Sequence, residues 1–565
     1  MCAPPLQETT LAAVEKLANQ VANWGAHKIG LPQHSSVCLM MQNNCQYVSV
    51  WLGMGKIGVG TALLNTNIAG TPLVHSVEVA LRDTTKKVMI VDSELAQALS
   101  VELADLKGRG VSVYLWDDLC DAVSGGVGTA SPARPPRKLR NMVNESDPLL
   151  FIFTSGTTGL PKAARISSTR LLMMTMPART MGYLKEGHSR MYCCLPLYHS
   201  AGGMLGAGSA LASGCTLVIR KKFSASNFSS DCVRHRCNSA QYIGELCRYL
   251  MLAPPSPADS QLDLQYIFGN GMRQEVWKPF MDRYGVSRVV EFYSATEANV
   301  GLFNSTGQVG ALGCVPRLLD FLYPVLILRV DPEHRDTPLR SKNGLCILAD
   351  VGETGLVVCK ITSSPLGRFE GYSDKAATGK KILVDVVESG DRYFNSGDLL
   401  HRDAFGFFYW ADRVGDTFRW KGENVATTEV EHVLAPLPFV SDLCVYGVEV
   451  PNYDGRCGMV AISLAGMEGR SVDDVLATVD WGLYHQECVT HLPMYARPRF
   501  IRVSGTALQT TGTFKHQKNV QIKAGYSAEA LKEGERLFFY FPKSGKVLPL
   551  DPKLHRDIEE GSVKL

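Results

Sequence analysis

A short apolar run that ends in a loop of hydroxyls and glycines constrains this chain most. The run is Leu149–Phe153, and the loop reads Thr154-Ser155-Gly156-Thr157-Thr158-Gly159-Leu160-Pro161-Lys162. Glycines let backbone N–H groups turn toward an anion, the hydroxyls add donors, and Lys162 adds a positive charge. The pattern predicts a buried strand that delivers a loop to the β- and γ-phosphates of a nucleotide. Because Pro161 precedes the lysine and no Ser or Thr follows it, the loop differs from that of kinases and P-loop ATPases.

Helical patterns and short apolar runs alternate through the N-terminal half. Leu11, Val14, Leu17, Val21 and Trp24 recur at the spacing of one helix face. The other apolar runs, each bounded by turn residues, are Val37–Met41, Lys87–Val91, Thr216–Ile219, Leu264–Phe268 and Val289–Tyr293. This alternation predicts an α/β fold with buried, largely parallel strands.

The chain is long enough for two domains. Its 565 residues are more than a single hydrophobic core usually accommodates. The pattern of apolar and charged residues changes after residue 412. The patterns there predict a helix at Thr427–Ala435, a strand at Leu443–Val450, a helix at Val472–Cys488 and a strand at Arg499–Val503. We therefore expect a large N-terminal domain over 1–414, with mostly parallel sheets and flanking helices, and a small mobile α+β domain over 415–565.

Composition narrows the class of protein. Lys and Arg number 58 against 55 Asp and Glu, which argues against a nucleic-acid binder but leaves room for a local basic surface facing anionic lipid. The 16 cysteines form no C-x-x-C pair, so we expect reduced, mostly buried side chains. Residues 122–140, rich in Gly, Pro, Ser and basic residues, predict an exposed linker or loop.

The longest apolar stretch, Tyr47–Leu64, is interrupted by Lys56 and four glycines. A membrane span needs about 20 clean apolar residues, so we expect a buried helix that runs into a loop at Asn65–Asn67. The N-terminus shows no signal-peptide pattern. Membrane attachment is then expected to be peripheral, or supplied by a segment outside this sequence.

Four later segments place further polar residues after apolar runs. They are Gly269-Asn270-Gly271-Met272-Arg273, Glu291-Phe292-Tyr293-Ser294-Ala295-Thr296-Glu297, Tyr393-Phe394-Asn395-Ser396-Gly397-Asp398 and residues 412–424, Asp-Arg-Val-Gly-Asp-Thr-Phe-Arg-Trp-Lys-Gly-Glu-Asn. With the loop at 154–162, and in this order, they resemble the adenylate-forming (AMP-binding) superfamily. Residues 412–424 and 510–518 are particularly similar to its fatty acid transport protein branch, also called very long-chain acyl-CoA synthetases. The resemblance runs from about residue 11 to the C-terminus.

The resemblance implies an ATP-dependent, AMP-forming fatty acid–CoA ligase that supports fatty acid uptake. Such an enzyme needs Mg²⁺ and coenzyme A, and it first makes an acyl-AMP because a free carboxylate is a poor acyl donor. The implied partners are a fatty acid, ATP, CoA and a membrane surface, with no nucleic acid and with a homodimer left open.

The nucleotide is expected to contact the loop residues, Lys162 included, and a set of later residues. The Tyr293 ring could stack on adenine, although a core position suits a tyrosine equally. Gly269 and Gly271 would let the main chain pass close to the base, or would simply form a turn.

Thr296 and Glu297 offer a hydroxyl and a carboxylate suited to a phosphate oxygen and Mg²⁺, although a lone Thr-Glu pair is usually a helix cap. Ser294 and Ala298 stand where the resembling branch has glycines. His199, in a segment that the family places beside the acyl pocket, is expected either to gate that pocket or to be a structural histidine.

The remaining site residues follow from the resemblance. Asp398 would accept hydrogen bonds from the ribose hydroxyls, and Arg413 would reach the same ribose or a phosphate. Gly415 lies at the position of the family's hinge, where a glycine absorbs a large change in φ and ψ. Arg419 would lie on the face presented for thioester formation.

Lys515 is the expected adenylation lysine, because a cation eases the approach of a carboxylate to a phosphate. Lys518 is the alternative. Two other functions stay open: a CoA ligase for a bile acid or aryl acid, and a membrane fatty-acid carrier whose nucleotide binding is regulatory. The enzyme is favoured because a carrier has no need of the whole set Lys162, Glu297, Asp398, Arg413 and Lys515.

The expected location is a membrane of the endoplasmic reticulum or the cell surface, with the active site facing the cytosol. The terminal Val563-Lys564-Leu565 partly resembles a peroxisomal address. Relative to the resembling family the chain starts late, since that family's N-terminal membrane segment and first strand would precede Leu11.

Overall fold

The residues that the computed structural model describes form two compact units. They are residues 8–565 except 122–124, 156–160, 182, 322, 324, 332–336, 366, 415–417, 422, 454, 512–515 and 564, and except the side chains of Ser155 and Asn424. Unit 1 runs to residue 325 and includes 359–384 and 390–394. Unit 2 comprises 326–358, 385–389 and 395–565.

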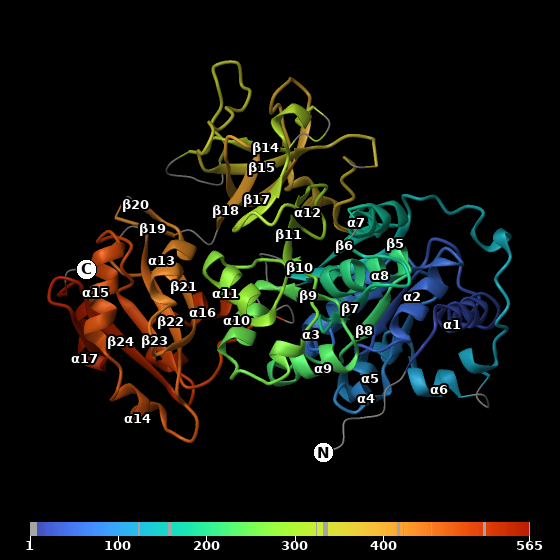
Figure 1. Ribbon diagram of the computed structural model, residues 1–565, viewed down its shortest axis with the longest axis horizontal. Coiled ribbons are helices and arrows are strands. Elements are labelled where there is room, and N and C mark those ends of the chain that lie inside the picture. The colour runs from blue at the N-terminus through green and yellow to red at the C-terminus, as the bar shows by residue number, and fades with distance from the viewer. Residues whose placement is uncertain are drawn as a thin grey trace. The chain divides into compact units, whose positions relative to one another are not determined.

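The first sheet of unit 1 has six strands (Figure 1). In spatial order they are β4 (Ser112–Leu115), β3 (Val88–Val91), β1 (Ser36–Met40), β2 (Gly60–Leu63), β5 (Pro148–Ser155) and β6 (Pro161–Ser167). All neighbours are parallel except β5 and β6. Both faces are covered: Val37 and Leu39 pack with α1 (Leu11–Asn23) and α2 (Tyr47–Gly55), whereas Cys38 and Met40 pack with α3 (Gly70–Ala80) and α5 (Ser100–Gly108).

The second sheet of unit 1 has the order β12 (Gly301–Asn304), β11 (Arg288–Ser294), β10 (Tyr266–Asn270), β9 (Ser239–Ile243), β7 (Arg190–Cys193) and β8 (Thr216–Ile219). Only the β11–β12 pair is antiparallel. Phe268 and Phe292 stack at 5.0 Å in the core that α1 and α2 share. On the other face, Ile267 lies with Leu250 of α10 (Gly244–Leu252) and Phe280 of α11 (Gln274–Tyr284).

Shorter elements complete unit 1. They are α4 (Ser93–Ala96), α6 (Trp116–Cys120), α7 (Ser168–Thr180), a π-helix (Ser200–Gly208), α8 (Ser209–Ser213), α9 (Phe228–Arg234), β13 (Ala311–Cys314), α12 (Lys375–Gly379) and β16 (Ile382–Val384).

Unit 2 contains most of one mixed sheet and the whole of another. The first has the order β18 (Phe407–Arg413), β17 (Arg392–Arg402), β15 (Gly355–Lys360) and β14 (Val325–Leu328). The second has the order β21 (Val440–Glu449), β22 (Arg456–Leu464), β23 (Phe500–Ser504), β24 (Glu535–Phe541) and β25 (Lys546–Pro549), and only its β22–β23 pair is parallel.

A small hairpin and five helices surround the second sheet of unit 2. They are β19 (Phe418–Trp420) with β20 (Glu423–Val425), then α13 (Thr427–Leu434), α14 (Val472–Leu476), α15 (Trp481–His491), α16 (Lys518–Ala524) and α17 (Pro552–Glu559). Trp420, Tyr484 and Phe539 are buried in the core of this part.

Most of the predicted elements are confirmed. The opening helix is α1, and the six apolar runs are β1, β3, β5, β8, β10 and β11. The fold class is confirmed as well: unit 1 is an α/β body of mostly parallel sheets, and the C-terminal part is sheet-rich. The domain boundary at 414/415 and the mobility of the small domain stay predictions.

Two predicted helices are wrong in part. The helix expected over Tyr47–Leu64 ends at Gly55, because Gly58 turns the chain with a φ of 73° and the remaining apolar residues form the buried strand β2. The helix expected over Val472–Cys488 is interrupted, because the Asp480 side chain accepts N–H groups of Gly482 and Leu483 and starts α15 as a new helix.

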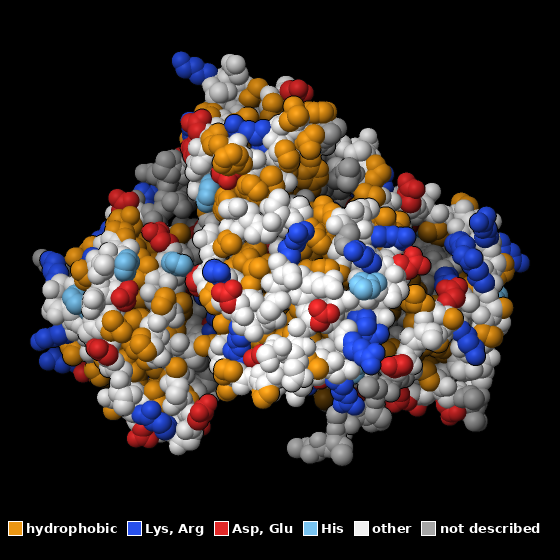
Figure 2. All heavy atoms as spheres, viewed as in Figure 1, with side chains coloured by type: hydrophobic (Ala, Val, Ile, Leu, Met, Phe, Trp, Pro, Cys, Tyr) orange, Lys and Arg blue, Asp and Glu red, His pale blue; other side chains and the backbone are white. Residues whose placement is uncertain are grey.

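The surface matches the near-balanced charge of the sequence. Figure 2 shows acidic and basic side chains interspersed over the visible face of both units. Most of the described cysteines are buried, as expected. Among the helices that the structure describes, none is long and apolar enough to span a bilayer.

Candidate active site

Two strands of the first sheet frame the predicted phosphate loop. β5 ends at Ser155 and β6 begins at Pro161, and they pair as an antiparallel hairpin. Thr154 and Lys162 are directly opposite in this register, so their side chains lie on the same face. Outside the described residues are the Ser155 side chain and Gly156, Thr157, Thr158 and Gly159.

Thr296 and Glu297 occupy a tight turn between β11 and β12. The turn is closed by the Ala298 N–H, which donates to the Ala295 carbonyl at 3.0 Å. Neither residue caps a helix here. The Glu297 carboxylate accepts a hydrogen bond from the Tyr372 hydroxyl at 2.7 Å. The turn therefore presents a hydroxyl and a carboxylate from adjacent positions.

Tyr372 connects this turn to the phosphate-loop hairpin. Its backbone forms an isolated bridge with Ala164 of β6, and its hydroxyl interacts with the Thr154 side chain, which opposes the rise in its pKa. Burial, and then the Glu297 carboxylate, raise the pKa of Tyr372, so the phenol keeps the proton that it donates to Glu297. Tyr372 thus links the Glu297 carboxylate to the hairpin that carries Thr154.

A buried guanidinium lies behind the turn. Arg170 Nη2 donates to the Ala295 carbonyl at 3.3 Å. Burial lowers the pKa of Arg170, and attraction to the Glu370 and Glu297 carboxylates opposes that shift. Glu370 is held in turn by the Ser167 N–H at 2.8 Å. The Glu297 carboxylate therefore faces a compensating positive charge inside the protein.

The π-helix begins beside the same turn. Ser200 Oγ lies 3.1 Å from Thr296 Oγ1. The preceding His199 packs against the Tyr198 ring at 4.7 Å between centroids, and burial lowers its pKa to about 4, so it is neutral at pH 7. His199 Nε2 is buried and has no hydrogen-bond partner among the described residues. Buried polar atoms are normally paired, so this nitrogen is suited to a bound ligand.

The two predicted glycines at the end of β10 serve different purposes. A Cβ at Gly269 would lie 2.1 Å from the Tyr242 carbonyl oxygen, so the protein's own packing requires this glycine. Gly271 has a φ of 80°, and a Cβ there would meet nothing closer than 3.8 Å. Tyr293, close to the end of the adjacent β11, is 6% exposed.

Glu291 fixes the turn that follows β10. It is 1% exposed, and its Oε1 accepts the N–H of Gly271 and, at 3.3 Å, the N–H of Met272. Its Oε2 accepts the Tyr242 hydroxyl. Burial raises the pKa of Glu291 to about 8, although these hydrogen bonds favour the charged form. The carboxyl group joins β9, β10 and β11 below the predicted adenine site.

In unit 2, β17 and β18 bring Asp398 and Arg413 together. The two residues are opposite in register, and Arg413 Nε donates to Asp398 Oδ1 at 2.7 Å. The Asp398 side chain is 3% exposed and that of Arg413 is 38% exposed. The residues predicted to share the ribose are therefore neighbours, with the cation on the accessible side.

Lys518 is engaged in a structural contact. Its Nζ donates to Thr427 Oγ1 at 2.7 Å and lies 3.4 Å from the Glu431 carboxylate. A lysine held in this way is poorly placed to serve a ligand, which favours Lys515 of the two candidates. Lys515 itself and the predicted hinge Gly415 lie outside the described residues.

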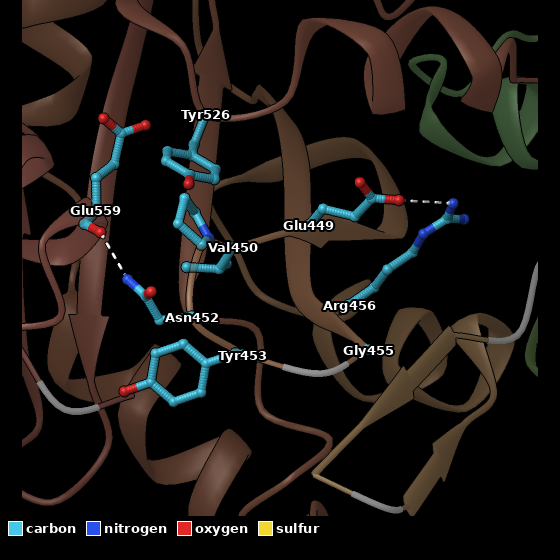
Figure 3. A pocket seen from close by; sticks show the side chains of 9 residues that line it. Glu449, Val450, Asn452, Tyr453, Gly455, Arg456, Tyr526 and Glu559 are labelled. Carbon is cyan, nitrogen blue, oxygen red and sulfur yellow. Dashed lines mark hydrogen bonds and ion pairs between the residues drawn. The ribbon is translucent and has the colours of Figure 1, made fainter.

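An open cavity of about 760 Å³ lies next to the hairpin that carries Arg419 (Figure 3). Gly455 on its rim forms a bridge with Trp420. On its wall Glu449 and Arg456 pair at 3.2 Å and cancel each other's charge. The described residues that line it include none of the predicted site residues, so this cavity lacks the features of a phosphate site.

Residues 5–335 match the family model of the AMP-binding enzymes. Long-chain fatty acid transport protein 1 of Mus musculus is 38% identical over 98% of this chain and 84% of its own length. Long-chain fatty acid transport protein 2 of Rattus norvegicus is 39% identical over 98% of this chain and 87% of its own length. The chain belongs to the fatty acid transport protein family. Membership of this family makes it an AMP-binding enzyme.

Solved structures share the fold of this fatty acid transport protein family member. ATP-bound MatB from Rhodopseudomonas palustris has a TM-score of 0.72 at 19% identity, over 92% of this chain and 94% of that one. The anthranilate CoA ligase AuaEII in complex with anthranoyl-AMP has a TM-score of 0.73 at 19% identity, over 93% and 94%.

Within unit 1 of this family member, the structure gathers Thr154, Thr296 and Glu297 around residues that the sequence did not single out. Tyr372 and Arg170 lie outside every segment that carried the resemblance, so no local pattern marked them. Glu291 begins one of those segments, and its position in an otherwise apolar strand was the only available signal.

Proposed function

We propose that this chain is an ATP-dependent ligase that converts a long-chain or very long-chain fatty acid to its adenylate and then to its CoA thioester, and so supports fatty acid uptake. The observation that carries the proposal is the link that Tyr372 makes in a member of this family: its hydroxyl donates to Glu297 in the turn after β11, and its backbone bridges Ala164 of the phosphate-loop hairpin.

The oxygen atoms at this turn suit Mg²⁺. Glu297 Oε1 accepts from Tyr372, and the other carboxylate oxygen and the Thr296 hydroxyl are the hard oxygen donors that Mg²⁺ prefers. Glu297, with Thr296 nearby, would hold the ion together with phosphate oxygens. When bound, Mg²⁺ neutralises phosphate charge. The ATP-bound structure of MatB, which has the same fold, supports ATP as the co-substrate.

Adenylation is the first half-reaction. The substrate carboxylate attacks the α-phosphorus of ATP, the bond to the bridging oxygen breaks, and pyrophosphate leaves. Thr154, Lys162 and the loop between them would hold the β- and γ-phosphates, and Lys515 would offset the charge where two anions meet. Asp398 and Arg413 would hold the ribose. The anthranoyl-AMP complex of the same fold supports an acyl-adenylate intermediate.

Thioester formation is the second half-reaction. The CoA thiolate attacks the acyl carbonyl carbon, and AMP leaves with the bonding electron pair. We place Arg419 on the face that the small domain, 415–565, presents in this step, with Gly415 as the hinge. We assign His199 to the acyl pocket, because it is neutral and its Nε2 has no hydrogen-bond partner among the described residues.

The names of the relatives support a long-chain fatty acid as substrate and fatty acid transport as the role. We propose membrane association with the active site facing the cytosol, at the endoplasmic reticulum or the cell surface, and a peroxisomal location as the alternative. Fractionation of the tagged protein tests the location. The oligomeric state, for which the sequence left a homodimer open, is tested by light scattering.

Pyrophosphate release tests the activity. Purified protein is given ATP, Mg²⁺ and acids from octanoate to lignocerate, with cholate and benzoate in parallel. We expect release that depends on the long acids and palmitoyl-CoA formation once CoA is added. Release with cholate or benzoate alone would point to a ligase for another acid, and ATP binding without release by any acid would point to the carrier.

A pair of lysine variants separates the half-reactions. We expect Lys515→Ala to slow palmitate-dependent pyrophosphate release on the order of 10²-fold while thioester formation from added palmitoyl-AMP is kept. Lys518→Gln, at the engaged lysine, should affect both reactions equally and lower the melting temperature. Equal loss of both half-reactions in Lys515→Ala would contradict its assignment.

A further inference from the structure

Asparagines of α1 hold a proline-rich segment against unit 1. Asn23 Nδ2 donates to the carbonyls of Ser131 and Ala133, both at 2.8 Å. Asn19 Nδ2 donates to the Pro132 carbonyl at 3.0 Å. Both asparagines are buried, so these bonds satisfy polar groups that would otherwise be costly to bury. The segment is therefore anchored rather than a loose linker.

A second anchor follows along the same segment. Gln33 Nε2 donates to the Lys138 carbonyl at 3.3 Å, and Gln33 Oε1 accepts the Met142 N–H at 3.2 Å. Pro135, between the two anchors, is buried. We call residues 128–142 the basic strap, because both of its ends are fixed to unit 1 and most of its residues are exposed.

The strap presents unpaired positive charge. Its cations are Arg134, Arg137, Lys138 and Arg140, of which the first three are exposed and the last is partly exposed. No Asp or Glu occurs between residues 122 and 144, and none of the four cations has an ionic partner among the residues that the structure describes. Arg109 of the same unit, by contrast, pairs with Asp105 and Glu78.

An apolar side chain lies at the end of this charge. Met142 is 71% exposed. In Figure 1 the strap runs along the outer edge of unit 1, and Figure 2 shows Lys and Arg side chains along that edge.

We propose that the basic strap is a docking surface for a bilayer that contains anionic phospholipid. Cations beside an exposed methionine match an interface at which basic groups meet lipid phosphates and an apolar side chain enters the acyl layer. A nucleic acid is the poorer fit, because the chain carries a net charge of only +3 and a buried proline interrupts the run of cations. The strap would hold unit 1 at the surface into which fatty acids partition.

This inference goes beyond the proposed activity, since vesicle binding requires neither ATP nor an acid. The experiment is co-sedimentation of the full chain with vesicles of phosphatidylcholine alone or with equal parts of phosphatidylserine. We expect binding only with phosphatidylserine, and a decline as salt is added. The variant R134Q/R137Q/K138Q/R140Q should lose about 600-fold in partitioning, because each of the four cations near an anionic surface contributes about fivefold.

The control removes the same charge from exposed positions of unit 2, K543Q/K546Q/K553Q/R556Q, and should change partitioning by less than about threefold. Met142→Ser should lower it by about fivefold. Glutamine leaves the backbone anchors intact, and an unchanged melting temperature verifies this. Wild-type affinity in the strap variant, an equal loss in the control, or equal binding to neutral vesicles would overturn the proposal.

Discussion

Glu291 and Glu297 stand at the two ends of one segment of unit 1, yet their surroundings differ completely. Glu291 is 1% exposed in the middle of β11 and accepts N–H groups of Gly271 and Met272 and the Tyr242 hydroxyl. Glu297 lies in the turn beyond the strand, partly exposed, and receives the Tyr372 hydroxyl on Oε1.

The comparison separates a carboxylate that builds the site from one that serves a ligand. The carboxyl oxygens of Glu291 accept hydrogen bonds from groups inside the protein, so replacing Glu291 should lower the stability of the fold. The Glu297 carboxylate lies in an accessible turn beside the phosphate-loop hairpin, so replacing Glu297 should slow the reaction. Substitutions at the two positions, and at their hydroxyl partners, test this division.

The largest effect is expected for Glu297→Gln. Removing the charge weakens the proposed Mg²⁺ site, so kcat/KM for palmitate-dependent pyrophosphate release should fall on the order of 10³-fold. The melting temperature should stay near that of the wild type, because the amide fits the same turn. If Glu297→Gln instead lowered the stability strongly and the folded fraction kept its activity, Glu297 would be a structural residue.

Glu291→Ala should act in the opposite way. Three donors lose their acceptor in a buried position, so the free energy of unfolding of unit 1 should fall by about 3 kcal/mol, as measured by urea denaturation. Glu186→Ala is the matched control, because that side chain is 76% exposed and its loss should cost less than about 0.5 kcal/mol. Similar losses in the free energy of unfolding for the two variants would contradict the structural role of Glu291.

Tyr372→Phe should have a smaller and more specific effect. It deletes one hydroxyl and with it the hydrogen bond to Glu297, while the ring stays in place. Because a hydrogen bond to a charged group contributes about 1.5 to 3 kcal/mol, we expect the KM for MgATP to rise about tenfold with little change in kcat. An unchanged KM would show that Tyr372 does not position Glu297.

The last expected effect is a dependence of stability on pH. Burial raises the pKa of Glu291 from its ordinary 4.5 to about 8 in the folded protein. Between these values the native state keeps a proton that the unfolded chain releases, so this contribution to stability is full below pH 4.5 and is lost as the pH rises through 8. Wild-type protein should therefore lose more stability between pH 5.5 and 8.5 than Glu291→Gln, by urea midpoint. Equal slopes would argue that Glu291 stays ionised.

Local patterns were sufficient for six strands of unit 1 and for the chemistry of single segments. Apolar runs bounded by turn residues identified β1, β3, β5, β8, β10 and β11, because burial on both faces of a parallel sheet leaves a continuous apolar run. The same reasoning failed at Tyr47–Leu64, since a buried helix and a buried strand are equally apolar and only the turn at Gly58 separates α2 from β2.

The sequence by itself determined the family, the order of the site segments and the residue types that a nucleotide requires, because these are properties of contiguous residues. Only the tertiary structure decided that Tyr372 and Arg170 join the site, that Lys518 is engaged with Glu431, and that α1 anchors the basic strap. Those contacts link residues far apart in the chain, and a hydrogen bond between distant segments imposes no local periodicity that a sequence pattern could reveal.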